Sequence, residues 1–274
     1  MELTLVNGRP ADQVAVSERA LHYGDGLFET ISCRLGRPRW LALHWQRLQA
    51  GCRRLQLPFE DFQSLTDEVT QLAAGTSECI IKVIVSRGAA KQRGYRPSGQ
   101  ETPTRIVSRH PWPVESDAGR PLRVALSSVR LGINPLLAGL KHLNRLEQVL
   151  AQQARPEGID EVLMLSSAGE LVGGSMSNVF LVNEAGLFTP AVHQCGVAGV
   201  MRRLLLEIAD SSRTDRACQI IIRPVSADEL AGVSEAFVTN VRWGIRSIAR
   251  LDGRELAGDD RARRLRTVLD AQGG

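Results

Sequence analysis

Residues 133–150 read INPLLAGLKHLNRLEQVL, and the interpretation of the whole chain depends on this stretch. It carries no charge from Ile133 to Leu140, and Lys141 follows directly. Apolar surroundings favour the neutral form of a lysine, which suits an amine that forms a Schiff base. The alternative is an ordinary solvated lysine between a loop and a helix, which is the commoner case. Spacing alone leaves both interpretations open.

The sequence of residues 133–150 resembles the lysine segment of the aminodeoxychorismate lyases. These enzymes belong, with branched-chain and D-amino acid aminotransferases, to the fold-type IV pyridoxal-phosphate family. Three other segments resemble motifs of this family and occur in the family's order. They are HYGDGLFET at 22–30, the glycine-rich N-terminal signature; HWQRL at 44–48, the arginine helix; and GVAGVMR at 196–202, the phosphate-binding turn. The resemblance therefore covers nearly the whole chain.

The resemblance implies a two-domain α+β fold of the D-amino acid aminotransferase-like type, with the cofactor at the domain interface. The expected elements agree, because strands outnumber helices and hairpin turns are frequent, which favours α+β over a doubly wound sheet. Three prolines in the segment from His110 to Pro121, the last included, exclude continuous helix or central strand there. We therefore expect a smaller N-terminal α+β domain at 1–112, a linker at 113–121 and a larger cofactor-binding domain at 122–274.

Local patterns predict the individual elements. Apolar residues at helical spacing predict helices at 43–55, 61–74, 143–155 and 201–209. Apolar and β-branched runs predict strands at 3–6, 30–34, 79–86, 104–108, 122–127, 161–165, 179–182, 219–223, 236–240 and 245–251. Gly169 is expected to turn the chain so that 161–165 and 179–182 form a hairpin. The basic run at 261–266 is typical of the solvent face of a last amphipathic helix.

The resemblance also assigns the cofactor site. Lys141 is expected to hold pyridoxal 5'-phosphate through an aldimine and to act as the catalytic residue. Arg47 is expected to bind the cofactor phosphate, since arginine can bind phosphate oxygens through two hydrogen bonds. The turn at 196–201 precedes a helix and contains no acid, so its N–H groups suit an anion. By analogy with relatives, the backbone of Val200 and Met201 and a residue at or near Asn240 complete the phosphate site.

One position departs from the family pattern. The segment LVGGSMSNVF at 171–180 aligns without gaps with the family's glutamate segment, in which a glutamate keeps the ring nitrogen protonated. Gly173 stands at the position of that glutamate. Glu170 is three positions away and is expected to face elsewhere, because side chains alternate along extended backbone. Either another group replaces the carboxylate or activity is weakened.

Substrate contacts are expected in the loop at 91–99, which resembles a loop near the active site of the lyases. 4-Amino-4-deoxychorismate carries two carboxylates, so cationic residues should surround it. Arg93 and Tyr95 are the candidate substrate residues. The alternative is an ordinary exposed surface loop.

These assignments imply a pyridoxal-phosphate-dependent carbon–oxygen lyase. It would eliminate pyruvate from 4-amino-4-deoxychorismate to give 4-aminobenzoate for folate biosynthesis. One alternative is a branched-chain or D-amino acid aminotransferase on the same fold. The other is a weakly active or non-catalytic homologue that binds the cofactor, which Gly173 would explain.

Composition argues against several other classes. No apolar run approaches the ~20 residues of a membrane span, and the N-terminus lacks the pattern of a secretion signal. The five cysteines are scattered without a Cys-x-x-Cys pair, which predicts a reducing compartment and no disulfide framework. No metal site is expected from the dispersed histidines. A net charge of +4 with 4% aromatic residues argues against nucleic-acid binding. We expect a cytoplasmic enzyme, and the resemblance implies a homodimer.

Overall fold

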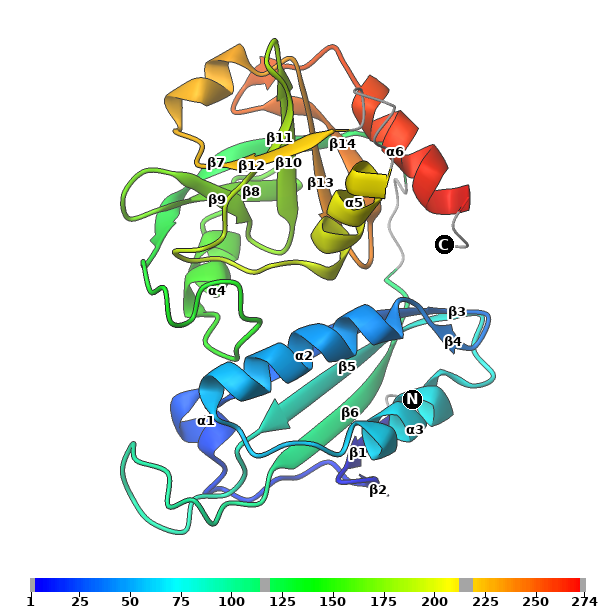
Figure 1. The fold of residues 1–274 in the computed structure, drawn as a ribbon, viewed down its shortest axis with the longest axis vertical. Coiled ribbons are helices and arrows are strands. Elements are labelled where there is room, and N and C mark those ends of the chain that lie inside the picture. Colours follow the sequence, from blue (N-terminus) through cyan, green and yellow to red (C-terminus); the bar gives the residue numbers. More distant parts are fainter. Residues whose placement is uncertain (1–2, 114–118, 212–218, 272–274) are drawn as a thin grey trace. The chain divides into compact units, whose positions relative to one another are not determined.

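The computed structural model describes residues 3–113, 119–211 and 219–271 (Figure 1). Residues 114–118 of the expected linker, and Cys218, lie outside these ranges. The chain forms two compact units, Met1–Val114 with Leu140–Asn144, and Glu115–Gly139 with Arg145–Gly274. The short segment that carries Lys141 thus groups with the N-terminal unit. The domain boundaries expected from the sequence stay a prediction.

The first unit is built on a six-stranded antiparallel sheet with the order β2-β1-β6-β5-β3-β4. The strands are β1 (Leu3–Val6), β2 (Arg9–Pro10), β3 (Gly26–Arg34), β4 (Arg37–Pro38), β5 (Glu78–Ser86) and β6 (Thr104–Pro111). The central pair, β3 and β5, stays in register from Gly26 opposite Ser86 to Arg34 opposite Glu78. A short helix, α1 (Arg19–Tyr23), precedes β3.

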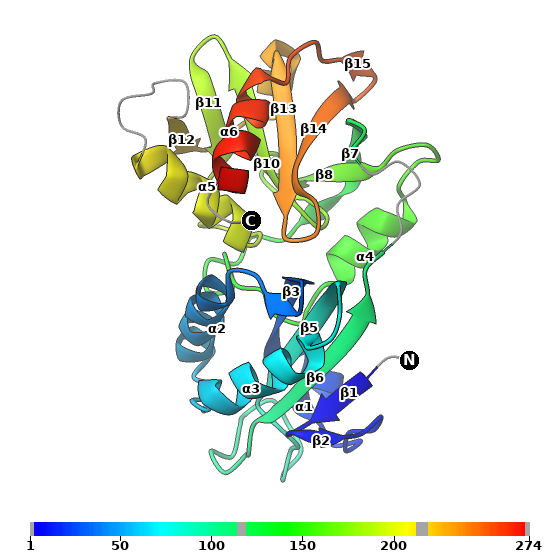
Figure 2. The same cartoon turned by 90° about the vertical axis from the view of Figure 1, so that its right-hand side faces the viewer.

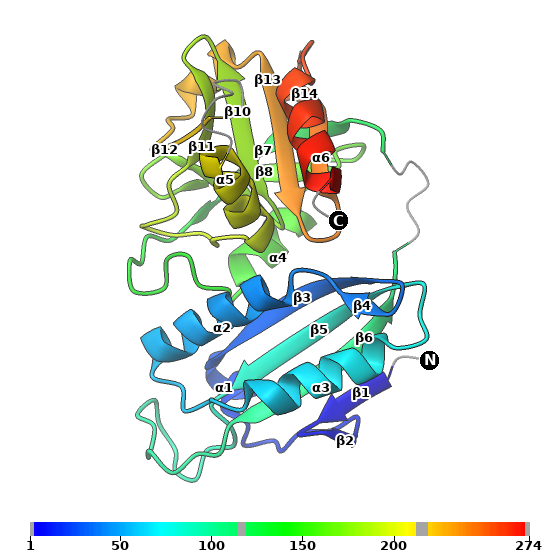
Figure 3. The same ribbon diagram turned by 45° about the vertical axis from the view of Figure 1, so that its right-hand side comes forward.

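Two amphipathic helices, α2 (Leu41–Leu55) and α3 (Phe62–Ala73), cover one face of this sheet (Figures 2 and 3). Their buried apolar residues are Leu48 and Cys52 on α2 and Leu65, Val69 and Leu72 on α3. Asp61 caps α3 by accepting a hydrogen bond from the N–H of Ser64 at 3.1 Å. Both helices expected from apolar spacing in this unit are therefore confirmed, with ends that differ by at most two residues.

The second unit is built on a mixed sheet with the order β12-β11-β10-β13-β14-β7-β8-β9. The strands are β7 (Leu122–Leu131), β8 (Glu161–Ser166), β9 (Leu171–Gly174), β10 (Asn178–Asn183), β11 (Gly186–Pro190), β12 (Ile220–Arg223), β13 (Glu235–Asn240) and β14 (Gly244–Leu251), with β15 (Arg254–Glu255) paired to β14. β7 is parallel to β8 and β14, and β11 is parallel to β12. The expected α+β class is confirmed.

Opposite faces of this sheet carry different apolar groups. Val179 and Leu181 of β10 belong to the main core with Leu163, whereas Phe180 between them stacks on Phe237 with ring centroids 5.0 Å apart. The helices are α4 (Leu146–Gln153), α5 (Val200–Ser211) and α6 (Asp260–Ala271), with a 3-10 turn, η2, at Asp228–Gly232. α6 buries Leu265 and Leu269 while Arg263 and Arg264 are exposed, as expected of an amphipathic helix.

Two expectations about local structure are wrong. Gly169 does turn the chain, with φ +85°, but β8 pairs with β9 and not with β10. β10 pairs with β11 and β13. The helix expected at 143–155 begins only at Leu146, because the chain before it is paired with β3: His142 bridges Leu27, and the N–H of Leu143 donates to the carbonyl of Gly26.

Neither a membrane span nor a metal cluster is found in the part of the chain that the structure describes. No helix there has both the length and the apolar composition that a bilayer crossing requires. No group of three His, Cys, Asp or Glu side chains there could hold a metal ion.

Candidate active site

Lys141 lies beside the start of β3, held there by backbone hydrogen bonds. The N–H of Phe28 donates to the carbonyl of Lys141 at 2.9 Å, and the N–H of Leu143 donates to Gly26 at 3.0 Å. The lysine is half-buried, and its Nζ lies 4.2 Å from the centroid of the Phe28 ring, a cation–π contact. The backbone around Lys141 thus pairs alongside β3, through an antiparallel bridge between Leu27 and His142, and does not start a helix.

The glycines of the N-terminal signature make room for this segment. A Cβ on Gly26 would lie 2.7 Å from the carbonyl oxygen of Val85 and 2.9 Å from a methyl of Leu143. Gly24 has φ +61°, and a Cβ there would lie 2.5 Å from the side-chain oxygen of Asn144. Side chains at these two positions would displace the lysine segment, so the signature and Lys141 are parts of one arrangement.

The chain contains only three lysines: Lys82, Lys91 and Lys141. Lys82 is exposed on β5, with its Nζ 5.8 Å from the Phe28 ring, and Lys91 is exposed in a loop. Lys141 is therefore the only lysine side chain that is withdrawn from solvent. This count supports its assignment as the Schiff-base residue independently of the motif.

A buried charge cluster lies next to Phe28. Glu29 is 1% exposed and accepts hydrogen bonds from Nδ1 of His44 at 2.6 Å and from Nε of Arg47 at 2.7 Å. A second nitrogen of Arg47, Nη2, also contacts this carboxylate. Burial raises the pKa of Glu29, but the charge of Arg47 and the hydrogen bonds from Arg47 and His44 outweigh it and hold that pKa at about 2. The ionised carboxylate fixes the direction of the guanidinium of Arg47, the residue expected to bind phosphate.

His44 carries no charge in this cluster at neutral pH. Burial lowers its pKa, and the positive charges of Arg47 and Lys141 lower it further, although Glu29 opposes them. The neutral ring therefore carries its proton on Nδ1, which donates to Glu29, because an ionised carboxylate can only accept. Nε2 of His44 is buried and makes no hydrogen bond with any described residue.

The glycine turn, residues 196–199, lies in the second unit and leads into α5. Gly196 has φ +85°, and a Cβ there would lie 2.4 Å from a methyl of Val172. Asn178 holds the turn from both sides, because its side-chain oxygen accepts the N–H of Gly199 at 3.1 Å and its amide donates to the carbonyl of Val197 at 2.9 Å. The turn thus places backbone without bulky side chains directly before α5. Free N–H groups at the start of a helix bind anions.

The glycine turn is also bonded to the chain just before Lys141. The N–H of Gly139 donates to the carbonyl of Gly196 at 2.9 Å, and the N–H of Ala198 donates to the carbonyl of Gly139 at 3.0 Å. Only Leu140 separates Gly139 from Lys141 in the sequence. No pattern in the sequence indicated this pair of hydrogen bonds.

The first turn of α5 contains a buried cation. Arg202 is 7% exposed and donates through Nη2 to the carbonyl of Pro190 at 3.0 Å. Its Nε makes no hydrogen bond with any described residue, and burial lowers the pKa of the guanidinium. A desolvated guanidinium without a carboxylate partner is stabilised by any anion that approaches. Val200 and Met201, whose backbone is expected to contact phosphate, precede it in the same turn.

Gly173 lies on β9 beside the asparagine that holds the glycine turn. A Cβ on Gly173 would lie 3.0 Å from the carbonyl oxygen of Ser177 and 3.9 Å from the side-chain nitrogen of Asn178. A Cβ at this position therefore requires its neighbours to shift by only a few tenths of an ångström. Nothing else lies within 3.4 Å of that added atom, apart from the adjoining residues of the chain.

The buried carboxylate on the neighbouring strand, Glu161, is engaged in local hydrogen bonds. Glu161 is fully buried beside Gly174 and accepts hydrogen bonds from the hydroxyls of Ser175 and Ser177 and from the N–H of Val162. Its oxygens are thus occupied in holding the segment between β9 and β10. Glu170 lies in the turn before β9, where its backbone pairs with Ser166.

The remaining candidates serve local structure in this conformation. Asn240 accepts the N–H groups of Arg242 at 3.0 Å and Trp243 at 2.8 Å, which closes the turn between β13 and β14. Arg93 is exposed, and Tyr95 is 84% exposed with its ring centroid 5.3 Å from that of Tyr23. The binding roles expected for these residues stay predictions.

Comparison with known proteins gives relatives along the whole chain. Residues 26–251 match the family model described as amino-transferase class IV. The aminodeoxychorismate lyase of Vibrio harveyi is 33% identical over 254 residues, 91% of this chain and 92% of that protein. A crystal structure of 4-amino-4-deoxychorismate lyase from Pseudomonas aeruginosa matches with a TM-score of 0.91 and 41% identity, covering 99% of both chains. A putative branched-chain-amino-acid aminotransferase of Methanocaldococcus jannaschii is 28% identical over 262 residues, 91% of this chain and 88% of that protein.

Proposed function

The chain belongs to the amino-transferase class IV family, and from this premise we propose that it is a pyridoxal-phosphate-dependent aminodeoxychorismate lyase. The substrate is 4-amino-4-deoxychorismate, and the products are pyruvate and 4-aminobenzoate, a folate precursor. The expected fold-type IV architecture is confirmed by the solved relatives. The lyase is favoured over an aminotransferase because the lyase relatives share 33% and 41% identity, against 28% for the aminotransferase.

One observation carries the proposal. The glycine turn, which suits an anion, is hydrogen-bonded in both directions to Gly139, and a half-buried lysine follows two residues later. A phosphorylated aldehyde needs both an anion site and an amine. The chain offers no other lysine withdrawn from solvent.

The residues fit the cofactor. In the glycine turn, the Cβ atoms that are missing from Gly196 and Gly199 would each fall within 2.4 Å of a neighbouring atom, so the backbone itself forms the surface. We propose that Arg47, whose guanidinium Glu29 aligns, binds the phosphate, and that Arg202, whose Nε is buried, supplies further positive charge. We assign the backbone of Val200 and Met201 and a residue at or near Asn240 to the same phosphate, and Lys141 to the aldehyde.

Lys141 is the proposed base. Bound pyridoxal phosphate withdraws electrons from the substrate carbon that bears the amine and so acidifies its proton. Lys141 removes this proton from C4, and the C3–oxygen bond breaks, so that the enolpyruvyl group departs and is protonated to pyruvate. The ring that remains is aromatic, which favours the elimination. His44 stays neutral beside this lysine, so it adds no positive charge to the site.

Arg93 and Tyr95 are the proposed substrate residues. Their loop carries three cations, Lys91, Arg93 and Arg96, all exposed. Cationic side chains of this kind form strong charge-assisted hydrogen bonds with carboxylates, and the substrate has two. We also propose that the protein is a cytoplasmic homodimer. Its described cysteines, Cys33, Cys52, Cys79 and Cys195, are free and buried, which is typical of a reducing compartment.

Gly173 favours a second candidate, a homologue that binds pyridoxal phosphate but turns over slowly. No carboxylate side chain stands at this position, and Glu161 is occupied elsewhere. Turnover of purified protein separates the two candidates.

The test combines a label with an assay. The purified protein should show a Schiff-base absorbance band that borohydride abolishes, with the reduced cofactor attached to Lys141 by mass spectrometry. Pyruvate should form from 4-amino-4-deoxychorismate without any keto-acid acceptor. Attachment at Lys82 or Lys91, or pyruvate formation only when a keto acid is added, would contradict the proposal.

A further inference from the structure

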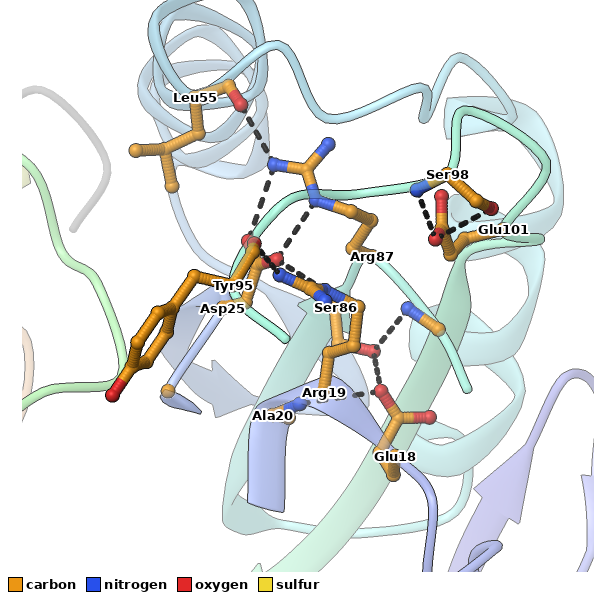
Figure 4. A network of polar contacts seen from close by, with 12 residues as sticks. Glu18, Arg19, Ala20, Asp25, Leu55, Ser86, Arg87, Tyr95, Ser98 and Glu101 are labelled. Atoms are coloured by element: carbon orange, nitrogen blue, oxygen red, sulfur yellow. Dashed lines mark hydrogen bonds and ion pairs between the residues drawn. The ribbon is translucent and has the colours of Figure 1, made fainter. Parts of the chain in front are cut away.

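Arg19 binds the tip of the loop at 91–99 to the rest of the first unit (Figure 4). Its side chain is 3% exposed, and its Nη2 and Nη1 donate to the carbonyls of Tyr95 at 2.7 Å and Gly94 at 3.2 Å. Its guanidinium also lies 4.8 Å from the ring of Tyr23, which in turn contacts Tyr95. The buried side chain of Arg19 therefore contacts both the backbone of the loop and Tyr23, the aromatic neighbour of Tyr95.

Asp25 holds the guanidinium of Arg19 in place and shares its carboxylate with Arg87. Nε of Arg19 and Nε of Arg87 both donate to Oδ2 of Asp25 at 2.8 Å. Burial raises the pKa of Asp25, but hydrogen bonds and charges from Arg87 and Arg19 outweigh it and keep that pKa below its usual range. The cluster thus contains two guanidinium groups and one carboxylate, all largely withdrawn from solvent.

The surplus positive charge is compensated by backbone carbonyls. Arg87 donates to the carbonyls of Leu55 at 2.8 Å and Gln56 at 2.7 Å, at the negative end of α2. For Arg19, the corresponding acceptors are Gly94 and Tyr95 of the loop. If the loop moved away, a buried guanidinium would lose both carbonyl partners, which is costly. The buried charge therefore favours one position of an exposed loop.

Hydrogen bonds to Glu101 also hold the C-terminal end of the loop. The carboxylate of Glu101 accepts hydrogen bonds from the N–H of Ser98 at 2.7 Å and the N–H of Gly99 at 3.0 Å. These bonds, the one from Ser98 above all, lower the pKa of Glu101 to about 2, so the acid is ionised and occupied within the loop. Among the described residues, no acid forms an ion pair with Lys91, Arg93 or Arg96.

We propose that Arg19 is a positioning residue, which holds the loop so that its cations and Tyr95 face an anionic substrate. This inference rests on the proposed function for the identity of that substrate and for its contact with the loop. It adds a residue that does not contact substrate itself but acts through Gly94 and Tyr95. The consequence is that Arg19 sets the affinity for a substrate with two carboxylates more than the rate of the chemical step.

The experiment compares the holoenzyme with the variants Arg19→Met and Arg19→Lys. Arg105→Met is the matched control, because Arg105 forms partly buried ion pairs with Glu68 and Asp61 that do not involve the loop. Trypsin is added under native conditions, and the cleavage rates after Lys91 and Arg93 are followed by mass spectrometry. KM and kcat for pyruvate release are measured in parallel, with the Schiff-base absorbance as a check on bound cofactor.

In Arg19→Met, cleavage in the loop should accelerate about tenfold or more, because proteolysis follows the population of the open form. KM should rise about tenfold while kcat changes less than about threefold, the pattern of lost substrate binding. Arg19→Lys keeps the charge beside Asp25 but cannot bind two carbonyls and a carboxylate together, so its cleavage rate and KM should lie between those of the wild type and Arg19→Met. The same two measurements on Arg19→Lys test the proposal if Arg19→Met does not fold.

Cleavage of the loop at the wild-type rate in both Arg19 variants would overturn the proposal. The proposal would also be overturned if the loop of the Arg19 variants were cleaved faster but their KM did not differ from that of Arg105→Met. A wild-type protein without lyase activity would contradict the proposed function alone, and the cleavage rates would still decide whether Arg19 holds the loop.

Discussion

The side-chain oxygen of Asn178 accepts the N–H of Gly199 at 3.1 Å, at a position where the glycine turn has no space for a side chain. A Cβ on Gly199 would lie 2.0 Å from that oxygen. Gly199→Ala should therefore break the hydrogen bond, lower stability by about 1–3 kcal/mol and weaken cofactor binding about tenfold or more. Absorbance titration with pyridoxal phosphate and thermal unfolding measure both effects. Gly232→Ala is the control, since a Cβ there meets nothing within 4 Å; equal behaviour of the two variants would contradict the role of the turn.

Gly173→Glu should raise the turnover of pyruvate release. A carboxylate at this position would keep the cofactor's ring nitrogen protonated, and each unit of pKa shift changes the protonated fraction up to about tenfold. Gly173→Gln is the control of equal size without the charge. Gly174→Glu should instead destabilise the protein, because a Cβ there would lie 2.2 Å from the hydroxyl of Ser177 and 2.8 Å from Glu161. Unchanged or reduced turnover in Gly173→Glu would mean that position 173 is not the family's glutamate position.

Lys141→Ala should abolish both borohydride labelling and pyruvate release, a loss of at least about a hundredfold for removal of a general base. Lys82→Ala is the matched control, because Lys82 also places its Nζ near the Phe28 ring, at 5.8 Å, but is exposed. The Lys82 variant should keep wild-type labelling and kcat. Retained labelling in Lys141→Ala would place the Schiff base on another amine.

Glu29 should make the protein sensitive to acid. Its pKa falls from 4.5 to about 2 on folding, so the ionised carboxylate stabilises the folded state fully above pH 4.5. This contribution is lost as the pH falls from 4.5 towards 2, and it is on the order of 3 kcal/mol. Urea unfolding between pH 3 and 7 should give a shallower loss of the free energy of unfolding for Glu29→Gln than for the wild type. Glu207→Gln, whose ion pair with Arg203 is exposed, is the control and should keep the wild-type slope.

The sequence predicted the elements that depend on local pattern. Apolar spacing located α2 and α3, and the motif around Lys141 located the lysine that the structure withdraws from solvent. Strand pairing between distant segments could not be inferred this way. β9 has only four residues, two of them glycines, so it carries no strand signal, and the partner of β8 was assigned wrongly.

The site was predicted only in part for a similar reason. Glu29, His44 and Asn178 lie within the segments 22–30, 44–48 and 171–180 that resemble family motifs. Sequence periodicity, however, does not tell which polar side chains are buried against each other. The hydrogen bonds of Gly139 to the glycine turn, and of Arg19 to Gly94 and Tyr95, join residues more than fifty positions apart. Contacts of this kind follow from the folded path of the chain and leave no mark on either segment alone.

The contact between Tyr23 and Tyr95 has a practical consequence, because these are the only two tyrosines in the chain. Protein grown with 3-fluorotyrosine would give two ¹⁹F resonances, one from α1 and one from the loop. With ring centroids 5.3 Å apart, each nucleus lies in the ring-current field of the other ring. Docking and release of the loop could then be followed in solution as paired chemical-shift changes, without an attached probe.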